Sequence, residues 1–293
     1  YLHQDKGSSG RPRPAADLES TLLSSVTNTD FPHALAVRQE MENWHFLQLN
    51  PVELRKPAAK FTAREFMAAD GSGLAGALFR IKASDPMNLQ NISREMANLI
   101  PGIASIDVVE DEIEKKYVIK AKMDDGRMFS SQVLSEGTLR LLALCTLKHD
   151  EQHRGVLCFE EPENGVNPMG LPKVLTLLHG LTTDFARDQE ATFPARQVLI
   201  NTHSPGLVAE VYKMKGVEQF GSIFFARLVT HISKGRKTQH TRLQQVDLEE
   251  ALQTKMNFDP NLRQVERSVG KAELLNYLES VRFEFEPNTL NEP

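Results

Sequence analysis

The chain has 293 residues, of which 40% are hydrophobic and 25% are charged, a composition that excludes disorder along its whole length and predicts one large or two modest globular domains. Its net charge of -5 excludes a protein that coats nucleic acid or anionic lipid with its whole surface, although a local basic patch can still bind phosphate. Two cysteines without disulfide or zinc spacing, no long apolar run and no secretory leader predict a cytoplasmic protein without membrane contact.

Short elements separated by turn residues fill the first hundred residues. A stretch rich in Gly, Ser and Pro at residues 7–14 predicts a surface loop, and residues 30–40 predict an amphipathic helix. A short buried strand is expected at residues 45–49. Apolar residues at helical spacing in 71–81 and in 92–99 predict two helices that pack on a neighbouring element.

The pattern changes twice after residue 100. Alternating apolar residues at 103–109 and 117–123 predict strands of a small antiparallel sheet. From Leu134 onward, helices alternate with short apolar strands, which is typical of a parallel sheet with covering helices and with its chemistry at the carboxyl ends of the strands. The last part predicts a β-hairpin and two closing helices, at residues 223–231 with 238–246, 248–255 and 271–281.

An acidic pair follows one of the apolar strands. Residues 156–159 are apolar and run directly into Glu160, Glu161 and Pro162. A buried strand that ends in paired carboxylates can deliver one to a magnesium ion and the next to an attacking water. The alternative is a core strand with a solvated acidic end.

Two further motifs accompany this pair. His203 follows the apolar residues 198–200, where a histidine can hydrogen-bond a terminal phosphate or orient a water; a structural histidine at a strand end is the alternative. Ser135 is expected to cap a helix, and Gly137 leaves backbone amides bare, so that an anion can sit on the helix end. Simple helix capping is the alternative for this third motif.

In this order and at this separation, the three motifs resemble the signature, Walker B and switch-histidine motifs of ABC-type ATPases, above all the SMC-like and RecF-like ones. The segment EEPENGVNP at residues 160–168 is the most specific part. The resemblance is strong over residues 134–207 and extends weakly upstream to 70–78. It implies an α/β fold with a P-loop NTPase-like parallel sheet and covering helices, plus a small antiparallel β/α lid subdomain. The expected division is an amino-terminal remainder of the ATPase head, a lid-like insertion and the ABC core, at residues 1–60, 61–130 and 131–293.

The resemblance also implies a role for each motif residue. Glu160 would hold Mg2+, Glu161 would be the general base, and His203 would sense the terminal phosphate. The nucleotide-binding residues would be Ser135, Gly137 and Thr138 at the helix start and Glu163, Asn164 and Gly165 in the loop between two heads. Because the helix start would cap ATP held by the opposite subunit, the resemblance implies a homodimer closed by ATP and Mg2+.

Three features depart from the family pattern. The relatives usually carry His at the position of Asn167, and Glu136 places an acid in the signature, where it suits the helix dipole. The sequence contains no Gly-x-x-x-x-Gly-Lys-Ser/Thr phosphate loop, since Gly270-Lys271 lacks both the preceding glycine and the hydroxyl residue. The family places this loop early in the chain, so we expect it before Tyr1.

The resulting expectation is a compact ATPase, without a coiled-coil arm, that opens and closes a dimer in DNA repair or phage defence. The main alternative is a nucleotide-gated clamp that controls an effector protein, a nuclease or toxin, with little turnover. A nuclease with a metal site made of Glu160, Glu161 and Glu163 is a third hypothesis. DNA is a candidate partner through the basic run at 231–242, for which a solvated hairpin tip is the alternative.

Overall fold

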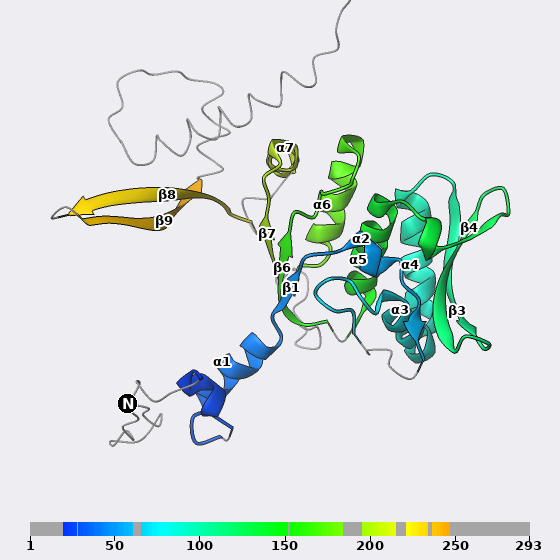
Figure 1. The fold of residues 1–293 in the computed structure, drawn as a ribbon, viewed down its shortest axis with the longest axis horizontal. Helices are drawn as coiled ribbons and strands as arrows, with labels where there is room; N and C mark the ends of the chain where they lie inside the picture. Colours follow the sequence, from blue (N-terminus) through cyan, green and yellow to red (C-terminus); the bar gives the residue numbers. More distant parts are fainter. Residues whose placement is uncertain are drawn as a thin grey trace, which may run out of the picture. The chain divides into compact units, whose positions relative to one another are not determined.

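The structure is a computed structural model (Figure 1). It describes residues 20–27, 29–60, 66–151, 153–183, 195–214, 221–233 and 236–246. The loop expected at 7–14 and the closing helices expected at 248–255 and 271–281 lie outside these residues.

The chain forms two compact units. The first unit comprises Tyr1–Asn167 and Thr176–Thr202, and the second comprises Pro168–Leu175 and His203–Pro293. The three-part division expected from the sequence stays a prediction. Within the described ranges, no helix is both long enough and apolar enough to span a bilayer.

A three-stranded parallel sheet lies in the first unit. It consists of β1 (His45–Leu47), β6 (Gly155–Glu160) and β7 (Arg196–Asn201), in the order β1-β6-β7. The register places Leu47 beside Phe159 and Glu160 beside Asn201, so the carboxyl ends of the strands meet at one edge. The parallel sheet predicted from the alternation of helices and apolar strands is confirmed.

The two faces of this sheet differ in burial. On one face Leu47, Leu157 and Phe159 are buried in the core. On the other face Phe46, Cys158 and Leu199 lie side by side across the three strands, and Phe46 and Leu199 are 62% and 61% exposed. Parallel sheets are normally covered on both faces, so this apolar row marks a face of the core that the described residues leave open.

The first unit also contains seven described helical segments. They are η2 (Leu22–Ser25), α1 (Pro32–Glu42), α2 (Pro51–Leu54), α3 (Leu74–Ser84), α4 (Pro86–Leu99), η3 (Ser131–Val133) and α5 (Glu136–His149). The α5 helix is the central one: its residues 138–147 are all buried, and it packs against α2, α3 and α4. Asp85 ends α3 and caps α4 by accepting a hydrogen bond from the Met87 amide, which explains the break between these two predicted helices.

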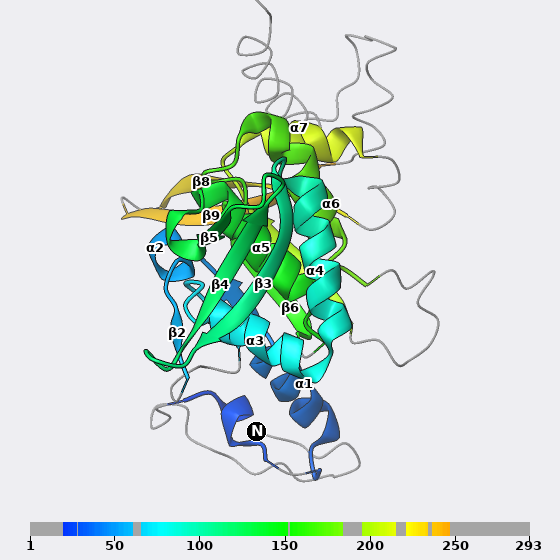
Figure 2. The same ribbon diagram turned by 90° about the vertical axis from the view of Figure 1, so that its right-hand side faces the viewer.

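The predicted antiparallel sheet is confirmed. Its strands are β2 (Ala58–Ala59), β3 (Ile103–Asp111), β4 (Lys116–Met123) and β5 (Met128–Ser130), in the order β2-β4-β3 with β5 paired to β4. Alternate residues such as Val108 and Ile119 are fully buried, and the sheet packs on α3 and α4 (Figure 2). Phe79 of α3 stacks on Tyr117 of β4 with ring centroids 3.9 Å apart.

The second unit contributes a helix and a hairpin. The α7 helix (Pro205–Lys213) is capped by Ser204, whose hydroxyl accepts from the Leu207 amide. β8 (Ile223–Ser233) and β9 (Arg236–Val246) pair along their full length as an antiparallel hairpin, which confirms the prediction with longer strands than expected. The remaining elements, η4 (Pro168–Gly170) and α6 (Leu171–His179), follow the first unit's acidic loop.

Candidate functional site

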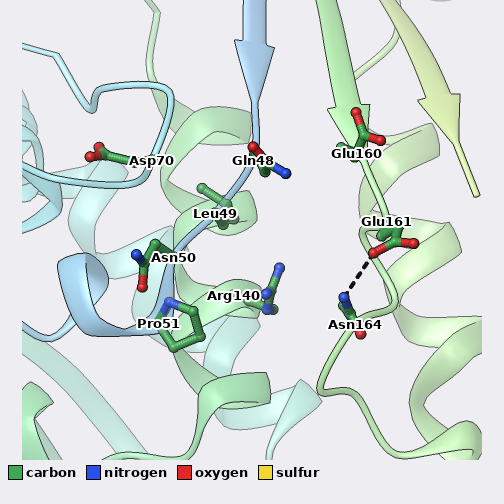
Figure 3. A pocket seen from close by; sticks show the side chains of 9 residues that line it. All are labelled: Gln48, Leu49, Asn50, Pro51, Asp70, Arg140, Glu160, Glu161 and Asn164. Atoms are coloured by element: carbon green, nitrogen blue, oxygen red, sulfur yellow. Dashed lines mark hydrogen bonds between the residues drawn. The ribbon is translucent and has the colours of Figure 1, made fainter.

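A cavity of about 410 Å³ lies at the carboxyl edge of the parallel sheet (Figure 3). Its lining comes from segments far apart in the sequence: Gln48, Leu49, Asn50, Pro51, Asp70, Arg140, Glu160, Glu161 and Asn164. Crevices at this edge are the usual ligand sites of parallel sheets, because loops that leave neighbouring strands meet there. The cavity is the site that the sequence placed at the strand ends.

The acidic pair lies at the end of β6. Asn201, at the matching position of β7, donates a hydrogen bond from its side-chain amide to Glu160, with Nδ2 and Oε1 3.0 Å apart. The second oxygen of this exposed carboxylate keeps its lone pairs, which suits a hard cation such as Mg2+. The neighbouring strand therefore orients the predicted metal ligand.

Glu161 has a left-handed backbone, with φ of 45°. This conformation is costly for a side chain other than glycine, and Pro162 disfavours helical angles just before it. Three hydrogen bonds hold it in place: its amide donates to the Asn201 carbonyl at 2.8 Å, and Asn164 donates to both its carbonyl and its carboxylate, at 3.0 and 2.9 Å. The predicted base is thus held in one orientation at the edge of the cavity.

The loop after Glu161 lies directly against the start of α5. A Cβ at position 137 would lie 2.9 Å from the carbonyl oxygen of Gly165, closer than real Cβ atoms come to such an atom. Gly165 itself has φ of 72°, and a Cβ there would meet the Glu136 carboxylate at 3.4 Å. Gly137 therefore allows the signature segment to contact the acidic loop of its own chain.

Ser135 caps α5 as predicted. Its hydroxyl accepts from the Thr138 amide at 3.2 Å, and the two side-chain oxygens lie 2.8 Å apart. Arg55 donates to the carbonyl of Leu134 at 2.9 Å and fixes the residue before the cap. The contact of Ser135 and Thr138 with a nucleotide stays a prediction.

Arg140, one turn into α5, brings a buried positive charge to the cavity. Its side chain is 8% exposed, and within the described part of the chain its Nε is buried without a hydrogen-bond partner. Burial lowers the pKa of the Arg140 guanidinium, while the charges of Glu136, Glu161 and Glu163 act in the opposite direction. An anion in the cavity would therefore meet the buried positive charge of Arg140, whose Nε is a hydrogen-bond donor not used within the described residues.

The remaining predicted residues are not among those that line the cavity. Glu163 accepts a hydrogen bond from the Thr202 hydroxyl, and its second carboxylate oxygen is buried without a partner in the described structure. His203 is the first residue of the second unit's longer segment, directly before the Ser204 cap of α7. The phosphate contact of His203 and the nucleotide contacts of Glu163 and Gly165 stay predictions.

Sequence reasoning missed Gln48, Asn50, Asp70 and Arg140. Gln48 comes directly after the strand β1, just as Glu160 comes at the end of the strand β6. A polar residue at the end of an apolar strand could therefore have identified Gln48 as a site residue. Main-chain hydrogen bonds join the segment after β1 to the loop that contains Asp70. The amides of Gln48 and Asn50 donate to the carbonyls of Ala69 and Asp70, each at 2.9 Å. Arg140 carries no such local signal, since its burial depends on neighbours distant in sequence, such as Gly165, where a Cβ would lie 3.9 Å from Arg140 Nε.

The oxygen-rich lining suits a magnesium-nucleotide complex better than an all-protein metal site. In the described ranges, no three His, Cys, Asp or Glu side chains group closely enough to hold a metal. Mg2+ is typically bound by one or two carboxylates together with water and substrate phosphates.

The opposite, amino edge of the sheet is closed by a buried polar cluster. Arg196 donates to the carbonyls of Lys148, Asp150 and His153 at 2.8–3.0 Å, which satisfies the carboxyl end of α5 and the connection to β6. His153 is 4% exposed, and burial, assisted by the charges of Arg196 and His45, lowers its pKa to about 4. This edge stabilises the sheet and holds His153 neutral.

Comparison with known proteins agrees with this geometry. A family model described as "AAA domain, putative AbiEii toxin, Type IV TA system" matches residues 5–209. The chain belongs to this AAA family. The match includes the acidic loop, the α5 start and the cavity lining, and it ends within α7, before the β8–β9 hairpin. The resemblance to SMC/RecF-like ATPases is thereby confirmed at the level of the family, whereas no curated protein matches this AAA domain.

Solved structures similar to this chain include proteins of the SMC class. One chain comes from work on ATP-driven dimerization and DNA-stimulated activation of SMC ATPases, with 14% identity, a TM-score of 0.37, and 59% of this chain and 92% of that chain covered. An Smc head domain from Pyrococcus furiosus, bound to the C-terminal domain of ScpA, has 14% identity and a TM-score of 0.38, with 59% and 38% covered. An Smc head domain from Pyrococcus yayanosii has 16% identity and a TM-score of 0.34, with 57% and 28% covered.

Proposed function

We propose that this AAA domain binds and hydrolyses ATP and acts as a nucleotide-driven homodimer. The observation that carries the proposal is the meeting of Glu160, Glu161 and Arg140 around one cavity at the carboxyl edge of a parallel sheet. Paired carboxylates beside a buried cation are the groups that phosphoryl transfer to water requires. A role in DNA repair or phage defence is proposed on the resemblance to SMC/RecF-like ATPases.

Four of the residues that line the cavity have a proposed part in this reaction. Glu160, oriented by Asn201, would hold Mg2+, which would offset the negative charge of the transferred phosphoryl group. Glu161 would accept the proton of the attacking water at its carboxylate, which Asn164 holds in place. Arg140 contributes a positive charge from a side chain that is itself buried.

Closure of a dimer is proposed to complete the site. Ser135 is exposed at the start of α5, where it bonds to the buried Thr138, and the acidic loop that carries Glu161 packs on the same helix start. ATP held between one subunit's cavity and its partner's helix start would favour the closed pair by mass action. Turnover should then depend on protein concentration.

The test is ATP turnover by the complete encoded polypeptide, measured over a range of protein concentrations beside Glu161→Gln. We expect turnover to rise more steeply than protein concentration and to fall about 100- to 10,000-fold in Glu161→Gln, the range typical of a lost general base. Glu114→Gln, in the exposed β3–β4 turn, makes the same charge change and should leave turnover unchanged. Equal turnover in Glu161→Gln and the parent would refute the role of the base.

A second candidate function is a nucleotide-gated clamp that binds and controls a toxin or nuclease effector with little turnover. The observation in its favour is the family description itself, which names an AbiEii toxin and a type IV toxin–antitoxin system. Tight ATP binding without turnover at any protein concentration would favour the clamp over the ATPase.

A further inference from the structure

The start of α5 is held by two segments that also form walls of the cavity. On one side, the Gly165 carbonyl of the acidic loop lies against Gly137. On the other side is the segment after β1, which supplies Asn50 and Pro51 to the cavity lining and continues through α2 to its carboxyl cap, Arg55. The contacts of Arg55 show how this second segment reaches α5.

Arg55 makes three hydrogen bonds to main-chain and side-chain groups of the first unit. Its guanidinium donates from Nη1 to the Pro51 carbonyl at 3.3 Å and from Nη2 to the Leu134 carbonyl at 2.9 Å. Its own carbonyl accepts from the hydroxyl of the fully buried Ser131 at 2.9 Å. These bonds connect Pro51, at the cavity, with the residue directly before the Ser135 cap.

The guanidinium of Arg55 is suited to holding two carbonyl oxygens at a fixed separation. Its donors lie in one plane and point in fixed directions, whereas a lysine ammonium is a point charge on a flexible stem. Among the described residues Arg55 has no ion-pair partner, so its donors serve the carbonyls of Pro51 and Leu134 alone. Its geometry therefore fixes the main chain on both sides of the contact.

We propose that Arg55 is a positioning residue that sets the start of α5 relative to the cavity. Through Leu134 it would orient the exposed Ser135, which is proposed to contact the nucleotide of the partner subunit. Arg55 is not among the residues that line the cavity, so it would act on the dimer contact and not on the reacting atoms. This role rests on the proposed function, because it gives Arg55 a part in closing the ATP-bound homodimer.

Loss of Arg55 should weaken association of the subunits and leave the chemistry intact. The helix start would keep its Ser135 cap and its contact with Gly165, but it would lose its hold on the opposite side. The backbone at Leu134 would then have to be ordered again whenever a dimer closes, and ordering one residue reduces an association constant by about 10-fold. ATP bound within one subunit uses the cavity, which Arg55 does not line.

The first experiment compares ATP turnover by the full encoded chain with that of Arg55→Gln over a range of protein and ATP concentrations. Arg55→Gln should raise the half-saturating protein concentration about 10-fold, or about 1.4 kcal/mol of association free energy, while the KM for ATP and the turnover at saturating protein stay within about twofold. Arg94→Gln removes an exposed arginine from α4 and should match the parent in all three quantities. An unchanged half-saturating concentration in Arg55→Gln, or a fall in saturating turnover alone, would overturn the proposal.

Hydrogen–deuterium exchange without nucleotide tests the positioning itself. The amides of Thr138 and Leu139, which donate to Ser135, should exchange about 10-fold faster in Arg55→Gln, while the amides of α4 keep the parent's rates. Ser131→Ala removes the other hydrogen bond between the two segments and should act in the same direction, which keeps the proposal testable if Arg55→Gln does not fold.

Parent rates of exchange at the start of α5 in both variants would overturn the role of Arg55. The exchange measurement needs no ATP, so the two proposals can fail separately. Absence of turnover in the parent would refute the ATPase, whereas faster exchange in the variants would still support Arg55 as the residue that positions α5.

Discussion

Gly137→Ala tests whether the start of α5 and the acidic loop form one rigid unit. The new methyl group would lie 2.9 Å from the Gly165 carbonyl oxygen, and this atom belongs to the backbone of a loop that is itself fixed at Glu161. Overpacking costs about 1–3 kcal/mol, and a backbone obstacle that cannot rotate aside places this case at about 2–3 kcal/mol, of which alanine returns about 1 kcal/mol through helix propensity. We therefore expect a net loss of about 1–2 kcal/mol in the free energy of unfolding.

Gly206→Ala is the matched control. Both glycines are the second residue of a helix capped by serine, at Ser135 and Ser204, so the propensity gain is the same. The methyl group at position 206 would meet the end of the Leu171 side chain at 3.1 Å, and a leucine methyl can move aside. Gly206→Ala should be neutral or stabilising by less than about 1 kcal/mol.

Thermal unfolding of both variants gives the comparison. For a unit of this size, 1 kcal/mol shifts Tm by about 2–4 °C, so Gly137→Ala should melt roughly 2–8 °C below the parent. A Tm equal to or above the parent's would refute the reasoning. It would mean that the acidic loop moves off the helix start at no cost, and that Gly137 is selected for another reason, such as bare amides for a phosphate.

Two further predictions concern buried charges. Because the pKa of His153 is lowered to about 4, the unfolded chain binds the extra proton between pH 6.5 and 4, and the unfolding free energy should fall as the pH drops through this window. At about 1.4 kcal/mol per pKa unit, the loss in unfolding free energy should approach about 3 kcal/mol near pH 4. His153→Gln should flatten the curve of Tm against pH. Parallel curves for His153→Gln and the parent would contradict this role of His153. Arg140→Gln should lower ATP turnover about 100-fold while Arg140→Lys keeps most of it, and equal turnover in Arg140→Gln and parent enzyme would remove Arg140 from the site.

The parts of the fold that sequence reasoning found are those with a local cause. An apolar run that ends in acids, as at Glu160, defines both a strand and the edge where it stops. Ser135 predicted its helix start because an amino-terminal cap is a local hydrogen bond. The hairpin followed from two alternating runs around a turn.

What the sequence did not reveal depends on contacts between distant segments. Arg140 resembles any polar residue of a surface helix until neighbours distant in sequence bury it. Gln48 lies more than a hundred residues from Glu160 and joins it only because β1 pairs with β6. From the sequence, Gly137 was interpreted as a phosphate-binding glycine. The structure adds a second reason for glycine at this position, the close approach of Gly165, which no local sequence pattern could reveal.

The two edges of the parallel sheet differ in how well their polar groups are satisfied. At the amino edge, Arg196 reaches three carbonyls. At the carboxyl edge, Glu161 carries backbone strain, and within the described residues a nitrogen of Arg140 and an oxygen of Glu163 are buried without partners. Folding alone would favour satisfied groups at both edges, because each unmet buried group costs about 1–3 kcal/mol. Backbone strain and unpaired polar atoms thus lie together at the carboxyl edge. They support a charged ligand at this edge independently of the acidic residues found there.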